Sequence, residues 1–137
     1  MSNVKNIRVK PVELKIDNET YKIKYDFNAF IELEEMYGSI DEAMEAIQGE
    51  IIKDKNGKSI TILVKDDKGK SKKTEKRKFS LKVMRDFLWA GLLYGDETIT
   101  KRAVAHLLEF GNFQYVVEKM MEAIKAGLPE KEDDEKN

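Results

Sequence analysis

Residues 25–47 read YDFNAFIELEEMYGSIDEAMEAI, and this stretch decides the fold because it pairs an apolar helical face with many carboxylates. At 100° per residue, one broad arc collects Phe27, Phe30, Ile31, Leu33 and Tyr37. The spacing predicts a helix over residues 28–37 that ends at Gly38, since glycine readily adopts the left-handed conformation after a helix. Ser39 or Asp41 is expected to begin a second short helix, because either side chain can cap its first turn.

The charge of this region is one-sided. Between residues 26 and 50 there are eight carboxylates and no lysine or arginine: Asp26, Glu32, Glu34, Glu35, Asp41, Glu42, Glu45 and Glu50. The formal net charge of the whole chain is only -1, because residues 51–78 carry 11 basic and 4 acidic side chains. An apolar face beside such an acidic block indicates a surface that holds a partner.

The length and composition predict one domain. With 137 residues, we expect a single domain over 1–128, a basic hairpin or loop excursion at 49–78, and a disordered acidic tail at 129–137. The absence of cysteine excludes disulfides, thiolate metal sites and cysteine nucleophiles. No apolar run approaches the roughly 18 residues of a membrane span, and the N-terminus lacks the apolar segment of a secretion signal. We therefore expect a cytoplasmic protein that does not associate with membranes.

Two segments predict β-hairpins. Residues 12–25 alternate apolar and polar side chains around an Asp-Asn-Glu turn, which indicates a hairpin with one buried face. In residues 49–65, Asn56-Gly57 lies between two β-prone runs and predicts a second hairpin. The lysine-rich residues 66–78 then predict a mobile limb, since they have too little apolar surface to order themselves alone.

The rest of the chain predicts three more helices. The first begins at Ser80 and carries two apolar stripes, so it should be central and mostly buried. The second is capped by Thr100 and runs through Phe110, and the third spans about 113–125 after the Gly111-Asn112 break. Together the segments predict a mostly helical α+β fold with an N-terminal hairpin, about five helices and a central basic β-hairpin excursion.

The sequence contains no recognisable catalytic, cofactor or metal site. Gly57-Lys58-Ser59 imitates the end of a phosphate loop, but Ile52 stands where the first glycine of that loop is needed. His106 is the only histidine, so neither a transition-metal site nor a histidine-based triad is expected. These patterns predict a binding protein rather than an enzyme.

Six residues are candidate partner contacts: Phe30, Leu33, Glu34, Glu35, Tyr37 and Trp89. Glu34 falls inside the apolar arc, and burying its bare charge would cost several kcal/mol. It must therefore pair with a cation, reach water, or lie where a partner docks, and we favour the first two. For Trp89, packing in the core is favoured over an interface hot spot.

The basic segment Lys65–Lys78 holds eight basic and three acidic side chains. We favour a solvated loop, because no aromatic residue is interleaved for base stacking and much of the chain is acidic. Two alternatives stay open. The segment could follow a phosphate backbone, as in a small nucleic-acid-associated regulatory protein, or it could fold back on the acidic block.

The order of four segments resembles phage tail assembly chaperones of the gene-transfer-agent type, found in tailed phages and prophages. The resembling residues are VELKIDNETYKIKYDFNAF (12–30), IELEEMYGSIDEAMEAI (31–47), FLWAGLLYG (87–95) and HLLEFGNFQYVVEKMMEAI (106–124). The four segments contain 64 of the 137 residues and lie between residues 12 and 124. The excursion at 49–78 is longer than compact members of the family need.

The resemblance implies a non-enzymatic protein in the cytoplasm of a bacterial host. Such chaperones bind the tape measure protein, help the tail tube protein to assemble around it, and do not remain in the mature virion. Some members also exist in a longer, frameshifted form, and this chain is similar to the short form. A homo-oligomer is a further partner that the resemblance leaves open.

Overall fold

The computed structural model describes residues 9–65 and 68–128, and this part of the chain is a small, mostly helical α+β fold. Its elements in chain order are β1 (Val12–Ile16), β2 (Glu19–Ile23), α1 (Phe27–Tyr37), α2 (Ile40–Gln48), β3 (Glu50–Ile51), β4 (Thr61–Lys65), β5 (Ser71–Glu75), β6 (Arg77–Lys78), α3 (Leu81–Leu92), α4 (Lys101–Ala105) and α5 (Phe113–Gly127). The predicted fold class is confirmed. The acidic tail predicted at 129–137 lies outside the described residues.

The N-terminal hairpin forms as the alternation predicts. Strands β1 and β2 pair antiparallel, and the turn residues Asp17 and Asn18 have φ of 53° and 67°. Aspartate and asparagine tolerate this left-handed conformation, which matches the twist of a two-residue hairpin turn. The inward side chains of Leu14 and Ile23 are completely buried, so the hairpin has one dry face.

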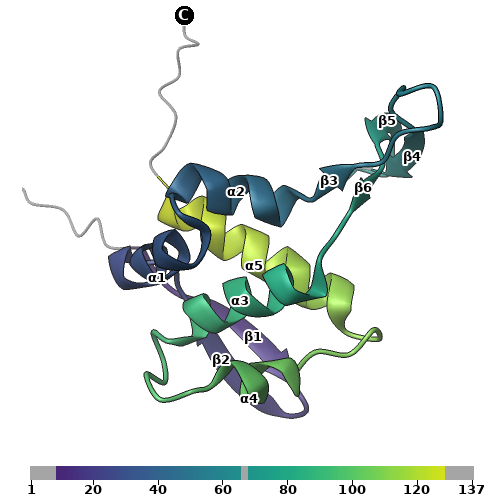
Figure 1. Cartoon of the computed structure of the whole chain (residues 1–137). Coiled ribbons are helices and arrows are strands. Elements are labelled where there is room, and N and C mark those ends of the chain that lie inside the picture. Colours follow the sequence, from purple (N-terminus) through teal and green to yellow (C-terminus); the bar gives the residue numbers. More distant parts are fainter. Residues whose placement is uncertain (1–8, 66–67, 129–137) are drawn as a thin grey trace, which may run out of the picture.

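Helices α3 and α5 cover that dry face, α3 over β2 and α5 over β1 (Figure 1). The contact with α3 is close because Gly91 has no side chain: a Cβ there would lie 2.6 Å from Cγ2 of Ile23. Two hydrogen bonds fix the approach. The Lys24 amide donates to the Gly91 carbonyl at 3.1 Å, and the Tyr25 hydroxyl donates to the Phe87 carbonyl at 2.6 Å.

Helix α1 ends and helix α2 begins at residues expected from the sequence, whereas the start of α1 differs by one residue. The Asp26 carboxylate accepts from the Ala29 amide at 3.0 Å, so α1 begins one residue earlier than predicted. Gly38 follows α1 with φ of 98°, and Ser39, rather than Asp41, caps α2 by accepting from the Glu42 amide at 3.0 Å. The short Gly38-Ser39 link makes α1 and α2 neighbours.

Helix α3 is the central element of the core. It begins where the Ser80 hydroxyl accepts from the Val83 amide at 3.2 Å. It contacts each of the other four described helices. The buried apolar side chains are Leu14, Ile16, Ile23, Tyr25, Ala29, Leu33, Ala43, Ile47, Met84, Phe87, Leu88, Ala90, Leu92, Val104, Val116, Met120, Ala123 and Ile124. The prediction of a mostly buried third helix is confirmed.

The fourth helix is shorter than the sequence predicts. It ends at Ala105 and turns replace the expected continuation to Phe110. The cause is the Asn112 side chain, which accepts from the Glu109 amide at 2.9 Å and donates to the Leu107 carbonyl at 2.9 Å. Asparagine side chains compete with helical hydrogen bonds in this way.

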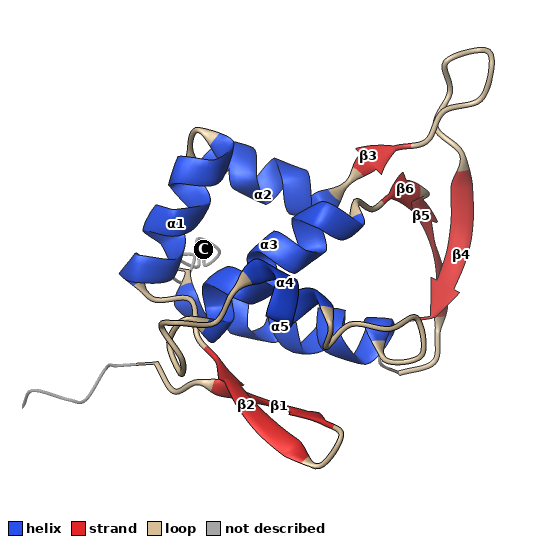
Figure 2. Ribbon diagram, turned by 60° about the horizontal axis from the view of Figure 1, so that its bottom comes forward, coloured by secondary structure: helices blue, strands red, loops and turns tan. Residues whose placement is uncertain are grey.

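Residues 50–65 and 68–78 form an arm that projects away from the helices, as both Figure 1 and Figure 2 show. The arm leaves from the end of α2 and returns at the start of α3. At its base Gly49 has φ of 82°, and a Cβ there would collide with the Lys78 carbonyl oxygen, so the two ends of the arm are pressed together. The predicted excursion is present at this place.

The hairpin predicted around Asn56-Gly57 is present but short. The Asp54 amide donates to the Lys58 carbonyl at 2.8 Å, and the Ile60 amide donates to the Ile52 carbonyl at 3.0 Å. The pairing differs from the prediction beyond Ile60, where strand β4 pairs with β5 instead of the preceding run. The expectation of a mobile limb is therefore wrong for residues 71–78. They are ordered as β5 and β6 because β4 and β3 offer their backbone edges for pairing.

Candidate partner-binding site

Two of the predicted contact residues, Phe30 and Glu34, lie together in a shallow groove on α1. We call it the α1 groove, and it is lined by Phe27, Phe30, Ile31, Glu34, Ile40, Gly127 and Leu128, with a volume of about 270 Å³. Phe27 is 82% exposed and Ile31 is 45% exposed, so the outer wall is apolar and open to solvent. Exposed large apolar side chains gathered in this way are typical of interaction surfaces.

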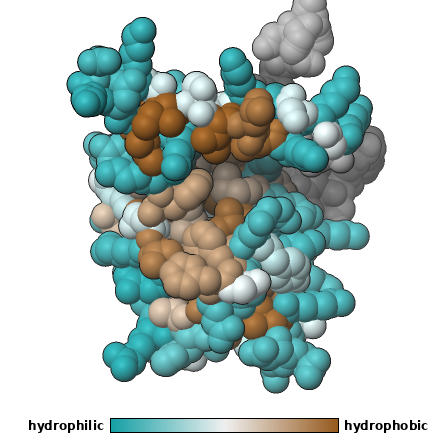
Figure 3. Space-filling view, turned by 90° about the vertical axis from the view of Figure 1, so that its right-hand side faces the viewer, coloured by the Kyte–Doolittle hydropathy of each residue, from teal (hydrophilic) through white to brown (hydrophobic). Residues whose placement is uncertain are grey.

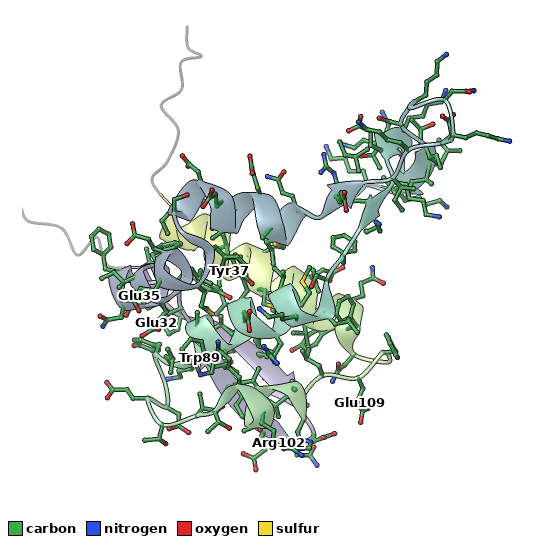
Figure 4. All side chains as sticks on the ribbon, in the orientation of Figure 1. Glu32, Glu35, Tyr37, Trp89, Arg102 and Glu109 are labelled. Carbon is green, nitrogen blue, oxygen red and sulfur yellow. The ribbon has the colours of Figure 1, made fainter. Side chains whose placement is uncertain are left out.

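One carboxylate of α1, Glu34, lines this groove, and Glu35 follows it in the helix. Glu34 and Glu35 are exposed, and none of the ion pairs within residues 9–65 and 68–128 involves either of them. Of the alternatives predicted for Glu34, exposure of its carboxylate to water is therefore the one that the structure shows. Figure 4 shows Glu32 and Glu35 on the side of the molecule away from the arm. The acidic surface predicted from the sequence is thus present along α1.

Leu33 is not available to a partner, which corrects its prediction as a contact. Its side chain has no exposed surface and packs in the core. Tyr37 is half-buried and bound within the chain: its ring centroid lies 6.0 Å from that of Phe87, and its hydroxyl donates to Asp86 at 3.0 Å. These two side chains hold α1 on α3.

Trp89 also has its main contacts inside the protein. Its indole N–H donates to the Ile99 carbonyl at 3.0 Å, and the Lys101 ammonium lies 5.0 Å from the ring centroid. The ring is half-buried against the core. This placement agrees with core packing, the favoured alternative. Trp89 does not line the α1 groove.

A buried carboxylate is the feature that sequence reasoning missed. Asp86 on α3 has no exposed surface. Its Oδ1 accepts from Nη2 of Arg85 at 2.8 Å, and its Oδ2 accepts from Nζ of Lys82 at 3.0 Å and from the Tyr37 hydroxyl at 3.0 Å. The Lys101 ammonium lies 3.9 Å from Oδ1. The sequence signal was a carboxylate placed four residues after one cation and next to another on α3.

The electrostatics of this cluster favour an ionised Asp86. Burial raises the pKa of Asp86, but hydrogen bonds from Arg85, Lys82 and Tyr37 lower it more, so its pKa lies below the usual 3.8. Burial and the neighbouring Asp86 charge raise the pKa of Tyr37, which therefore keeps its proton and donates. Because Lys82, Arg85 and Lys101 surround a single carboxylate, the cluster retains a net positive charge.

A second groove, also missed from the sequence, lies between α3 and the segment that joins α4 to α5. We call it the α3–α5 groove, and its lining is Leu81, Lys82, Arg85, Ala105, Leu108, Glu109, Phe110 and Phe113. Its volume is about 600 Å³, more than twice that of the α1 groove. Phe110 is 86% exposed and Leu81 is 58% exposed. Figure 3 shows apolar side chains gathered on this side of the molecule.

Sequence reasoning missed the α3–α5 groove because it placed Phe110 at the end of a longer helix and expected the helix that begins with Leu81 to be mostly buried. The signal was present in the Gly111-Asn112 break, which leaves the preceding phenylalanine outside any regular element. In the part of the chain that the structure describes, no three acidic or histidine side chains converge to hold a metal ion. None of its helices is both long and apolar enough to cross a bilayer.

Comparisons with known proteins do not assign the chain to a family. No family model, no curated protein and no solved structure matches it.

Proposed function

We propose that this chain is a tail assembly chaperone of a phage or prophage, which binds the tape measure protein and assists assembly of the tail tube. It acts in the cytoplasm of the bacterial host and leaves before the virion is complete. The proposal rests on the resemblance of the hairpin, the acidic α1–α2 segment, the tryptophan-bearing helix and the C-terminal helix to that family. The function requires binding and no covalent chemistry.

The observation that carries the proposal is the α1 groove with its free carboxylates. Phe27 and Ile31 stand one helical turn apart and are exposed at 82% and 45%, so they offer apolar contact without unfolding the core. Glu34 and Glu35 beside them are exposed. An amphipathic client helix would place its apolar stripe on Phe27 and Ile31 and its lysines near the carboxylates.

Co-expression with the tape measure protein of the same phage tests the proposal. The double substitution Glu34→Lys/Glu35→Lys reverses the charge at the groove, so we expect at least about a tenfold loss of affinity, equal to about 1.4 kcal/mol. The measurement is the amount of tape measure protein that co-purifies and its Kd.

A matched control uses two exposed carboxylates on α5. Glu118→Lys/Glu122→Lys changes the net charge by the same amount and leaves the α1 groove untouched, so binding should stay within about twofold. Phe27→Ser should weaken binding without changing the free energy of unfolding, because Phe27 is 82% exposed. Full co-purification of the Glu34/Glu35 variant would contradict the role of the carboxylates.

A second candidate function rests on the arm. The exposed lysines Lys65, Lys72, Lys73, Lys76 and Lys78 lie on or beside its strands, and a basic β-ribbon can follow a phosphate backbone. Residues 50–78 contain no aromatic side chain for base stacking. Titration with duplex DNA and with RNA at physiological salt separates the candidates, since steeply salt-dependent binding would favour a nucleic-acid-associated regulator.

A further inference from the structure

The α3–α5 groove differs from the α1 groove in its charges, since its lining holds two cations, Lys82 and Arg85, and one carboxylate, Glu109. Its apolar floor, formed by Leu81, Leu108, Phe110 and Phe113, is bordered on α3 by the cations Lys82 and Arg85. We infer that this groove is a second docking surface, which receives an amphipathic helix with carboxylates on the side of its apolar stripe that faces α3. The inference does not rest on the proposed function, because it concerns a different face with the opposite charge preference.

The two cations that border the groove have N–H donors that are not used within the described part of the protein and can bind a partner. The Lys82 side chain is 69% exposed and makes one 3.0 Å hydrogen bond to Asp86, so its ammonium has further N–H groups facing solvent. Arg85 uses Nε and Nη2 for Asp86, which leaves Nη1 for another acceptor. The one carboxylate of the lining, Glu109, lies in the segment that joins α4 to α5, so a partner's carboxylate would be bound by the cations on α3.

The form of the groove suits a helix rather than a strand. Its lining comes from side chains of α3, of the end of α4 and the turns after it, and of the first residue of α5. No strand contributes to the lining, so there is no backbone edge for a peptide to extend. Helix-in-groove binding instead uses apolar side chains spaced at i, i+3 or i+4 and i+7, which the long apolar floor can contact.

The two terminal segments of this chain lack the required chemistry. Residues 129–137 (PEKEDDEKN) contain carboxylates but no large apolar side chain. Residues 1–8 (MSNVKNIR) contain apolar side chains and two cations, Lys5 and Arg8, but no carboxylate. Charge complementarity with Lys82 and Arg85 therefore favours a helix from another protein.

The test uses two synthetic helical peptides of about 18 residues, long enough to hold a helix on binding. Both carry the same leucine stripe, and they differ only in flanking glutamates or flanking lysines. Fluorescence anisotropy with the full chain should give a Kd about tenfold lower for the acidic peptide. Phe110→Ser should raise the Kd of the acidic peptide about tenfold, since it removes the most exposed apolar side chain of the floor. Lys82→Glu should reduce or invert the preference between the two peptides.

Phe27→Ser provides the control, because it alters the α1 groove alone and should leave the acidic peptide's Kd unchanged. Circular dichroism and urea unfolding must show that the Phe110 and Lys82 variants remain folded. Equal binding of the two peptides, or no response to Phe110→Ser, would overturn the inference.

Two further results would assign the groove to another occupant and also overturn the inference. One is concentration-dependent dimerisation in sedimentation that Phe110→Ser abolishes, which would place a second copy of this chain in the groove. The other is a gain in peptide affinity after deletion of residues 1–8. The test is separable from the proposed function, since tape measure binding through α1 responds to Glu34 and Glu35 and the acidic peptide responds to Phe110 and Lys82.

Discussion

The part of the chain that the structure describes contains two antiparallel pairs of five-residue strands, β1–β2 and β4–β5, and they have opposite surroundings. In the β1–β2 hairpin, the third residue of the first strand is Leu14, which has no exposed surface. In the β4–β5 hairpin, the same position holds Leu63, which is 68% exposed. Helices α3 and α5 cover the first hairpin, whereas β4 and β5 pack chiefly on each other.

The different burial of Leu14 and Leu63 shows that strand pairing and burial are separate properties. The strands of both hairpins pair through backbone hydrogen bonds, but only the first hairpin places its apolar face under helices. An isolated two-stranded sheet is marginally stable in water, so the arm depends on its anchorage at Gly49 and Lys78. The stability of the protein should therefore reside in the helices and β1–β2, and not in the arm.

The largest expected effect comes from truncating the same residue type in both hairpins. Leu14→Ala should lower the free energy of unfolding by about 3 kcal/mol, because it leaves a cavity in a closed core. The matched substitution Leu63→Ala should change it by less than about 0.5 kcal/mol, since that side chain is already mostly in water. Urea unfolding monitored by circular dichroism measures both, and equal losses would contradict the comparison.

A smaller effect is expected at the buried carboxylate that holds α1, α3 and α4 together. Asp86→Asn should cost about 2 kcal/mol at neutral pH, because Lys82, Arg85 and Lys101 lose their shared anion but can still reach water. Urea unfolding at pH 7 measures the loss. A variant as stable as the parent chain would show that the cluster contributes no net stability.

The same variant has a defined pH dependence. The folded-state pKa of Asp86 is lowered below 3.8, so its stabilising contribution is full above that value and is lost as the pH falls through the folded pKa. The gap in unfolding free energy between the parent chain and Asp86→Asn should therefore be constant from pH 5 to pH 7 and narrow below about 3.8. A gap that widens on acidification would reverse the assigned sign.

Removing most of the arm is expected to have a smaller effect than Asp86→Asn. Ile52 donates its amide to the Lys76 carbonyl at 2.8 Å, so an Asn-Gly pair can replace residues 53–75 and close a two-residue hairpin between them. The unfolding free energy should change by less than about 1 kcal/mol, because the removed strands leave the core untouched. Calorimetry or urea unfolding checks this, and a large loss would show that the arm supports the helices.

Much of the fold could be predicted because local chemistry decides it. Asp17-Asn18 fixes the first turn, and Gly38, Ser39 and Ser80 mark helix ends through their own backbone or side-chain bonds. These features depend on residues within a few positions of each other, which a sequence pattern records directly.

The candidate site was less predictable because burial depends on distant segments. A helical wheel places Leu33 and Glu34 on the same apolar side of α1, but the core covers only Leu33. Asp86 is buried because Tyr37, 49 positions earlier, donates to it and Lys101 lies beside it from α4. The shortened α4, which exposes Phe110, follows from one asparagine side chain taking two backbone partners.

Trp89 gives this protein a built-in optical reporter. It is the only tryptophan in the sequence, and its indole is tied to the Ile99 carbonyl while the Lys101 ammonium lies over its ring. A cation near the indole and exclusion of water both shift its emission, so the fluorescence of the unlabelled chain reports the junction of α1, α3 and α4. A partner that pulls Lys101 away from Asp86 would therefore shift the emission maximum of Trp89, which can be measured without a dye or a tag.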